Sequence, residues 1–171
     1  MDKRYFLIMI LVIVCFVNLF LVANSSDLIG KATVDVGNFM FSSPHDYNLM
    51  DSYDNYVKLE NSQGITIMLF VLSNPKDNYD NALHTLQNNN NDTILSNGSI
   101  YVGDVTVNSI YYRHVVDSKV SNQAVYYFDK EGSHFKILMS GFRNDESGKN
   151  QTIQECIGIV DSLKINLKMT G

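Results

Sequence analysis

The sequence predicts an α+β domain, an antiparallel β-sheet sandwiched between helices (α/β/α), preceded by one N-terminal transmembrane helix. Most of the chain after its first 24 residues divides into short segments with the alternation typical of strands, and two amphipathic helical segments accompany them. Residues 65–72 (ITIMLFVL) are apolar at both alternating sets of positions, which is typical of a central strand covered on both faces. Because each helix has one apolar stripe, covering the two faces of a sheet is the economical way to bury all of them.

The chain begins with an apolar run from Tyr5 to Ala23, in which only Asn18 is strongly polar. As a helix rising about 1.5 Å per residue, this run reaches roughly 28 Å, close to the thickness of a bilayer's hydrocarbon core. Lys3 and Arg4 precede it, whereas residues 24–27 carry no positive charge. This asymmetry predicts a cytoplasmic N-terminus and a domain on the other side of the membrane.

The apolar segment has two interpretations. In the first, residues 1–24 are a signal anchor, so the protein is a single-pass protein of the cell membrane that enters the bilayer through residues 5–23. In the second, a secretory signal is cleaved after Ala23 and the domain is secreted. The apolar stretch of a secretory signal is about 7–15 residues long. The greater length of this run favours the anchor, and in both interpretations the domain is extracytoplasmic.

We expect residues 25–37 to form a tether and residues 38–171 to form a single extracytoplasmic domain. The 147 residues that follow the apolar segment are enough for one compact core and too few for two ordinary domains. They carry 11 basic and 17 acidic residues, a net charge of −6. An acidic surface repels phosphate backbones, which argues against nucleic-acid binding.

The first half of the domain predicts four strands and a helix. Alternation and turn residues place the strands at 39–41, 47–50, 56–60 and 65–72. Asn74-Pro75 ends the last strand. An amphipathic helix over 77–88 follows, because Tyr79, Ala82, Leu83 and Leu86 recur at helical spacing.

The second half predicts a solvated loop at the Asn88–Asn91 tract and then two strands, a hairpin and a helix. The strands cover 99–102 and 105–116, and the hairpin joins Ala124–Asp129 to His134–Ser140. A polar loop over 142–149 leads to the closing helix. Asn150 is its expected N-cap, and its apolar stripe consists of Ile153, Ile157, Val160 and Leu163.

Five features occur in a set order: the Phe41-x-x-Pro44-x-x-Tyr47 opening, the apolar strand Ile65–Leu72, the turn at Gly103, the hairpin over 124–140, and the closing Ile159-Val160-Asp161-Ser162-Leu163. Together they resemble the PsbP-like fold family, which includes the extrinsic lumenal subunit of photosystem II and many membrane-anchored prokaryotic proteins. The resemblance implies an α/β/α sandwich used for protein–protein contact and not for catalysis. No binding residue of the photosystem subunit matches a position here, so its partner and ion roles do not transfer.

Three asparagines are candidate glycosylation sites. Asn91, Asn97 and Asn150 each begin an Asn-x-Ser/Thr sequon, and all three fall in predicted loops. Their use depends on the host having the glycosylation machinery.

Four tyrosines are a candidate binding surface. Tyr111 and Tyr112 lie on one predicted strand and Tyr126 and Tyr127 on the next, so one tyrosine of each pair shares a face of the sheet. An exposed tyrosine platform would suit a glycan or a protein partner. The alternative is that these rings fill the layers between the helices and the sheet.

The sequence offers no constellation typical of catalysis or metal binding, and we expect no cofactor. The four histidines, His45, His84, His114 and His134, lack metal-ligand spacing, and His114 meets His134 only if their strands are neighbours. The acidic residues of 51–54 and 77–80 lack the order of a calcium loop. No nucleophile motif or phosphate-binding loop occurs.

These observations predict a membrane-anchored extracytoplasmic domain that binds a protein or cell-surface component and is not an enzyme. The alternative is an extracytoplasmic metal-dependent factor or enzyme that uses His114, His134 or the acidic loops. Cys156, the single cysteine of the domain, lies on the apolar stripe of the closing helix. We expect it to be a buried thiol.

Overall fold

The computed structural model describes residues 32–166. The predicted transmembrane segment at residues 5–23 and most of the predicted tether lie outside the described residues. Within residues 32–166, neither helix combines the length and the apolar character needed to cross a bilayer.

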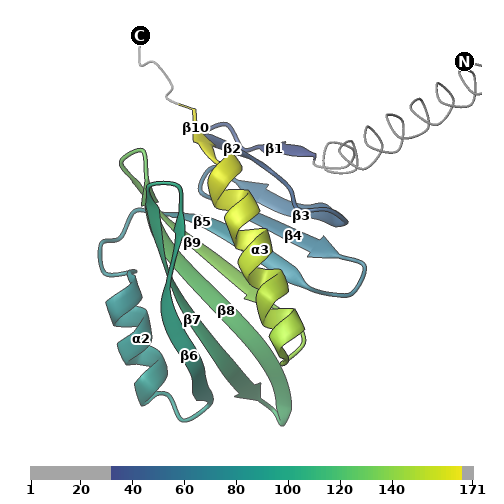
Figure 1. Ribbon diagram of the computed structural model, residues 1–171, viewed down its shortest axis with the longest axis vertical. Helices are drawn as coiled ribbons and strands as arrows, with labels where there is room; N and C mark the ends of the chain where they lie inside the picture. The colour runs from purple at the N-terminus through teal and green to yellow at the C-terminus, as the bar shows by residue number, and fades with distance from the viewer. Residues whose placement is uncertain (1–31, 167–171) are drawn as a thin grey trace, which may run out of the picture. The chain divides into compact units, whose positions relative to one another are not determined.

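Seven antiparallel strands form the main sheet, in the order β3-β4-β5-β9-β8-β7-β6 (Figure 1). The strands are β3 (Tyr47–Tyr53), β4 (Tyr56–Asn61), β5 (Thr66–Leu72), β6 (Asp92–Val102), β7 (Val105–Val116), β8 (Lys119–Lys130) and β9 (Ser133–Ser140). At the centre, β5 pairs with β9 along its whole length, from Thr66↔Ser140 to Leu72↔His134. The predicted antiparallel sheet is confirmed.

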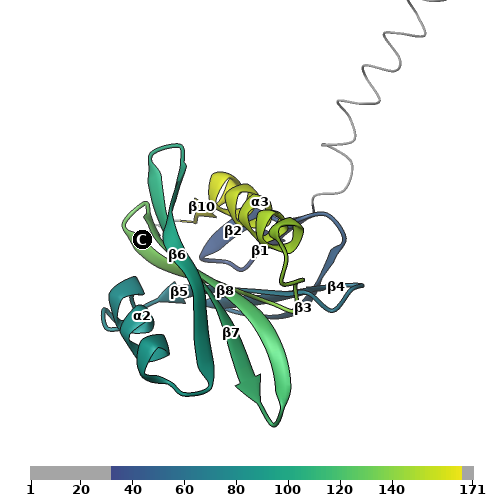
Figure 2. The ribbon, with the colours of Figure 1, turned by 60° about the horizontal axis from the view of Figure 1, so that its bottom comes forward.

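A second, three-stranded sheet joins the two ends of the described chain. β1 (Thr33–Asp35) and β10 (Lys164–Ile165) flank β2 (Phe39–Ser42), and both pairings are antiparallel. The two helices are α2 (Tyr79–Asn88) and α3 (Glu146–Ser162). Figure 2 shows α3 and the small sheet on one face of the main sheet, here called the inner face, and α2 on the other, the outer face.

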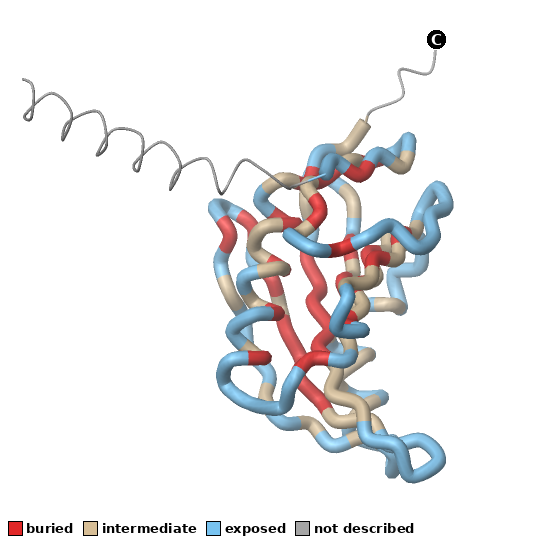
Figure 3. Tube along the Cα trace, turned by 90° about the vertical axis from the view of Figure 1, so that its right-hand side faces the viewer, coloured by how far each residue is buried: buried red, intermediate tan, exposed pale blue. Residues whose placement is uncertain are grey.

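The strongest packing lies on the inner face. β4 and β5 direct Val57, Leu59, Ile67 and Leu69 towards it, each at most 1% exposed, because alternate strand residues point to the same side. α3 contributes Cys156, Ile159 and Val160 to the same cluster. Figure 3 shows the buried stretches along the central strands. The outer face holds a smaller cluster of Ile110, Tyr112, Val125 and Tyr127, against which α2 packs. The predicted sandwich is therefore confirmed for these layers.

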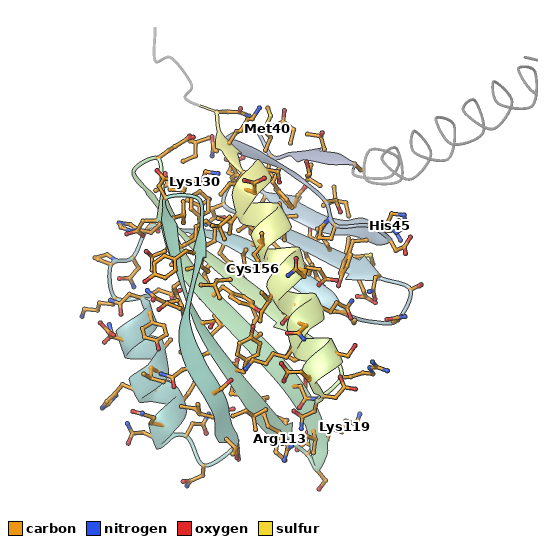
Figure 4. The ribbon with its side chains drawn as sticks, viewed as in Figure 1. Met40, His45, Arg113, Lys119, Lys130 and Cys156 are labelled. Carbon is orange, nitrogen blue, oxygen red and sulfur yellow. The ribbon has the colours of Figure 1, made fainter. Side chains whose placement is uncertain are left out.

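Side-chain hydrogen bonds stabilise the two ends of α3. Asp145 is the N-cap, and its carboxylate accepts a hydrogen bond from the Gly148 amide at 2.7 Å. The last turn of α3 contains no basic residue. Instead, Lys130 at the end of β8 donates from Nζ to the Val160 carbonyl at 2.6 Å (Figure 4), which places a positive charge at the negative end of the helix dipole.

Several boundaries differ from the sequence prediction. β1 falls within the predicted tether. The N-cap of α3 is Asp145 rather than Asn150, which lies exposed inside the helix. β6 begins at Asp92, so Asn97 lies in a strand and not in a loop. Residues 92–98 have low strand propensity, but pairing with the long strand β7 recruits them as the edge of the sheet.

Two glycines of α3 should respond to alanine in opposite directions. A Cβ on Gly148 would overlap the Arg143 carbonyl oxygen, whereas a Cβ on Gly158 would meet no atom within 4 Å. We expect Gly148→Ala to lower the free energy of unfolding by about 1–3 kcal/mol through overpacking. Gly158→Ala should raise it by about 0.4–1 kcal/mol, because alanine restricts the unfolded chain. Chemical denaturation of both variants measures the difference, and equal effects would contradict this packing around Gly148.

A half-buried carboxylate on α3, that of Glu155, makes stability depend on pH. Glu155 accepts hydrogen bonds from the Tyr47 hydroxyl (3.1 Å to each oxygen) and from Gln151 (2.9 Å). Burial nevertheless raises the pKa of Glu155 above its ordinary value of 4.5.

A raised pKa in the folded state favours folding most below the unfolded pKa, and that contribution is lost as the pH rises through the folded pKa. Glu155→Gln, which keeps an acceptor for Tyr47 but carries no charge, should therefore be more stable than the parent at pH 7. The difference should shrink as the pH falls through the folded pKa towards 4.5. The matched control is Glu146→Gln in the exposed first turn of α3, which should be slightly destabilising at pH 7 because it removes a favourable charge near the helix N-terminus. Denaturation curves between pH 4 and 7 test both variants, and an advantage of Glu155→Gln that grew towards acid pH would refute the assignment.

Candidate functional site

α2 leaves half of the outer face without a covering element among the described residues. α2 lies against β6 and β7, while the outer-face side chains of β3, β4, β5 and β9 remain partly or fully exposed. We call this half the open face. Its residues alternate with the buried inner residues of the same strands, as Tyr56 and Lys58 do with Val57 and Leu59.

Three aromatic rings follow one another across the strands of the open face, the first pair stacked and the second tilted. The register aligns Tyr53 with Tyr56 and Tyr56 with Phe70. The ring centroids of Tyr53 and Tyr56 lie 6.2 Å apart, and those of Tyr56 and Phe70 lie 5.0 Å apart. At one end of this series of rings, the Lys136 ammonium lies 5.0 Å from the Phe70 centroid. Tyr53, 65% exposed, leaves the other end open to solvent. We call these three rings the aromatic row.

Lys136 also belongs to a polar network at the start of α2. Its Nζ donates to Asp77 Oδ2 at 2.6 Å, and the Tyr127 hydroxyl donates to Asp77 Oδ1 at 3.1 Å. Burial raises the pKa of Tyr127, and the neighbouring Asp77 carboxylate raises it further. Tyr127 therefore stays a neutral donor at physiological pH. Because Asp77 directly precedes the N-cap Asn78, this network fixes the start of α2 to the sheet.

Two hollows lie on either side of Asp77. One, of about 410 Å³, lies between α2 and the sheet and is lined mainly by α2, β8 and β9. The other, of about 630 Å³, lies among the 74–80 segment and the ends of β7, β8 and β9. Asn74, Asp77 and Tyr127 line both. The open face and the smaller hollow are separate candidate regions that both border Lys136.

The histidines are dispersed rather than gathered. His114 pairs with Asp92 and His134 with Asp129, each at 2.6 Å, and both β7 and β9 neighbour β8 rather than each other. His45 contacts Asp46, and Figure 4 shows it at the margin of the domain. Over residues 32–166, no three histidine, cysteine or acidic side chains are grouped so as to hold a metal ion.

The predicted tyrosine platform is wrong as a surface. Tyr111, Tyr112, Tyr126 and Tyr127 are all buried, at 5%, 9%, 0% and 8% exposure. Adjacent residues of a strand point to opposite faces, and here both faces are covered. Tyr111 and Tyr126 lie beneath α3, whereas Tyr112 and Tyr127 lie beneath α2 and line the smaller hollow.

The aromatic row was missed at the sequence level. Its signal was present, because Tyr53 and Tyr56 flank the Asp54-Asn55 turn and therefore end on the same face of a hairpin. Phe70 joins them only through the pairing of β4 with β5, which a single sequence does not specify.

The remaining predicted residues are placed as follows. Asn91, Asn97 and Asn150 are exposed, and Asn97 Nδ2 donates to the Tyr79 hydroxyl at 3.0 Å. Their glycosylation stays a prediction. Cys156 is fully buried, as expected, and burial raises the pKa of its thiol, so it is poorly reactive.

No protein-family model matches this sequence, and no curated protein matches it. Similar folds occur among solved structures. CyanoP, the cyanobacterial PsbP from Synechocystis, gives a TM-score of 0.50 at 11% identity over 80% of this chain and 91% of its own. LpqN of Mycobacterium tuberculosis is described as involved in cell envelope biogenesis. It gives a TM-score of 0.51 at 13% identity over 80% of this chain and 90% of its own.

A protein from Bacteroides thetaiotaomicron gives a TM-score of 0.52 at 10% identity over 81% of this chain, which spans about half (49%) of that protein's length. At these identities the similarity shows the fold alone. The expected PsbP-like fold is thereby confirmed.

The buried tyrosines form a hydrogen-bonded chain whose interruption should be costly. Tyr111 and Tyr126 hydroxyls lie 2.5 Å apart, and Tyr126 donates to Thr152 Oγ1 at 2.9 Å. Tyr126→Phe leaves the Tyr111 hydroxyl without this partner, so we expect unfolding free energy to fall by about 1–3 kcal/mol.

Removing both hydroxyls, in Tyr111→Phe/Tyr126→Phe, should cost less than the sum of the single changes. Tyr101→Phe is the control, since Tyr101 is 77% exposed. Denaturation curves give all four values, and strictly additive effects would show that the two hydroxyls do not interact.

Proposed function

We propose that this protein is a membrane-anchored extracytoplasmic domain that binds a partner protein or cell-surface component through the open face and catalyses no reaction. The aromatic row carries the proposal. Neighbouring rings that cross a sheet and end in a solvent-exposed tyrosine form an ordered surface, and core packing does not require Tyr53 to be there.

The composition of the open face resembles that of protein interfaces. Their centres are enriched in tyrosine, phenylalanine and methionine, and their rims are polar. Here the aromatic row and Met68 form the apolar part, and Asp51, Lys58 and Glu60 border it. Aromatic anchors already held by their neighbours lose little side-chain entropy when a partner binds.

Side-chain docking suits this region better than addition of a strand. β3 is the edge strand, and its register shifts between Leu49 and Asp51. The Asp51 carboxylate accepts a hydrogen bond from the Ser52 amide at 2.9 Å, so this backbone donor of β3 already has a partner. Bulges and charged residues are the usual means of protecting an edge against pairing. A partner would therefore contact the rings and not extend the sheet.

The extracytoplasmic location is supported by the sequence and by one similar fold. The apolar run at residues 5–23 and the charge asymmetry around it favour export and retention in the membrane. LpqN, which shares the fold, is described as involved in cell envelope biogenesis. A role at the cell envelope is therefore the natural setting for this domain.

Site-specific photo-crosslinking on intact cells tests the proposal. A photoreactive residue at Lys58, on the open face, should yield a discrete adduct, and the same residue at Gln154, on the exposed side of α3, should not. Tyr53→Ser/Tyr56→Ser should abolish the adduct, whereas Tyr101→Ser, which alters another exposed tyrosine, should leave it intact. Equal adducts from both positions would contradict recognition through the open face.

A reporter enzyme that is active only outside the cytoplasm, fused after residue 171, checks the compartment. Activity in the membrane fraction supports the anchored form, and activity in the medium supports the cleaved form. An inactive reporter on a stably produced fusion would remove the extracytoplasmic part of the proposal.

A further inference from the structure

We infer that the hollow between α2 and the sheet binds a small apolar anion, such as an aromatic carboxylate. The inference is independent of the proposed protein contact, because this hollow lies beneath α2 and not on the aromatic row. Its volume of about 410 Å³ falls within the range of small-molecule sites, about 300–1,000 Å³.

The walls of the hollow suit an apolar body. Ala82 and Leu86 line it from α2, and Val125 and Leu138 line it from β8 and β9. The Tyr112 ring adds an aromatic wall, and its hydroxyl is already bonded to Gln123 at 2.6 Å. A flat or compact apolar ligand would therefore replace water without leaving a buried polar group unpaired.

The polar end of the hollow has a positive charge. Lys76 and Lys136 line it together with a single carboxylate, that of Asp77, which gives a local charge of +1 in a domain whose net charge is −6. The Lys136 ammonium has three donors, of which Asp77 accepts one at 2.6 Å. The Tyr127 hydroxyl also lines the hollow, but it donates to Asp77 at 3.1 Å, so the two lysines supply the donors for an anion. These groups favour an anionic head and disfavour a cation.

α2 is only partly buried against the sheet. None of the ten residues of α2 is fully buried, whereas five residues of α3 are. A helix as short as α2 is marginal by itself and depends on docking for its stability. A ligand between α2 and the sheet would add the missing contacts and should therefore order the helix.

The larger hollow on the other side of Asp77 serves as an internal contrast. Asp77, Asp80, Asp104 and Asp129 all line it, and His134 is its one basic group. An anion would be repelled there. Binding of an anion near α2 can therefore be assigned to the smaller hollow.

The experiment compares 2-naphthoate with its neutral analogue 2-naphthalenemethanol. Full-length protein is held in nanodiscs of zwitterionic lipid, and binding is followed by calorimetry. We expect saturable binding of naphthoate, tighter than that of the alcohol by about tenfold, because one charge-assisted hydrogen bond is gained. Naphthoate should also slow amide hydrogen exchange in residues 79–88 while leaving residues 146–162 unchanged.

Two variants locate the site. Ala82→Phe places a ring inside the hollow and should abolish binding of both ligands. Lys136→Met should abolish the preference for the anion while retaining binding of the alcohol. If Lys136→Met does not fold, Lys136→Met/Asp77→Asn removes the pair together and carries the same expectation. Lys119→Met, at the far end of β8, is the charge control and should bind as the parent does.

The inference fails if naphthoate does not bind saturably at millimolar concentration, if Ala82→Phe binds it as the parent does, or if the alcohol binds as tightly as the acid. None of these results would affect the crosslinking from the open face. The two proposals therefore stand or fall separately.

Discussion

The pairing of β5 with β9 is the constraint on which the rest of the structure depends. These two strands are distant in sequence, and their ladder joins a hairpin built from residues 47–61 to the meander of β6 to β9. Their inner residues Ile67, Leu69, Ile137 and Met139 are each at most 1% exposed. Such a surface is stable only if it is covered, so α3 and the small sheet must both lie over it.

The two faces of the sheet are covered to different extents, and this difference generates the candidate sites. On the inner face, the 17 residues of α3 and the strands β1, β2 and β10 together bury the largest cluster. On the outer face, α2 has 10 residues and lies to one side. The open face and the smaller hollow are thus consequences of one short helix on a wide sheet.

Sequence reasoning succeeded where a segment's own pattern decides its structure. The apolar strand at 65–72, the helix at 77–88 and the hairpin at 124–140 have strong local periodicity, and the structure contains all three.

Sequence reasoning failed where pairing with another strand or capping of a helix decides the structure. Residues 92–98 are strand because β7 is there to pair with them, and α3 starts after Asp145 because the Asp145 carboxylate accepts the Gly148 amide hydrogen bond. The tyrosines at 126–127 showed the limit most clearly, since the alternation that places one on each face says nothing about what covers that face.

The small sheet has a mechanical consequence. β2 pairs with β1 over three residue pairs and with β10 over two, so the entry and exit of the domain meet on one strand. A tension applied through the N-terminus would load those few hydrogen bonds first, at one end of the domain, while the seven-stranded sheet stayed unloaded (Figure 1). Under such a tension β1 would separate from β2 before the main fold bears any force.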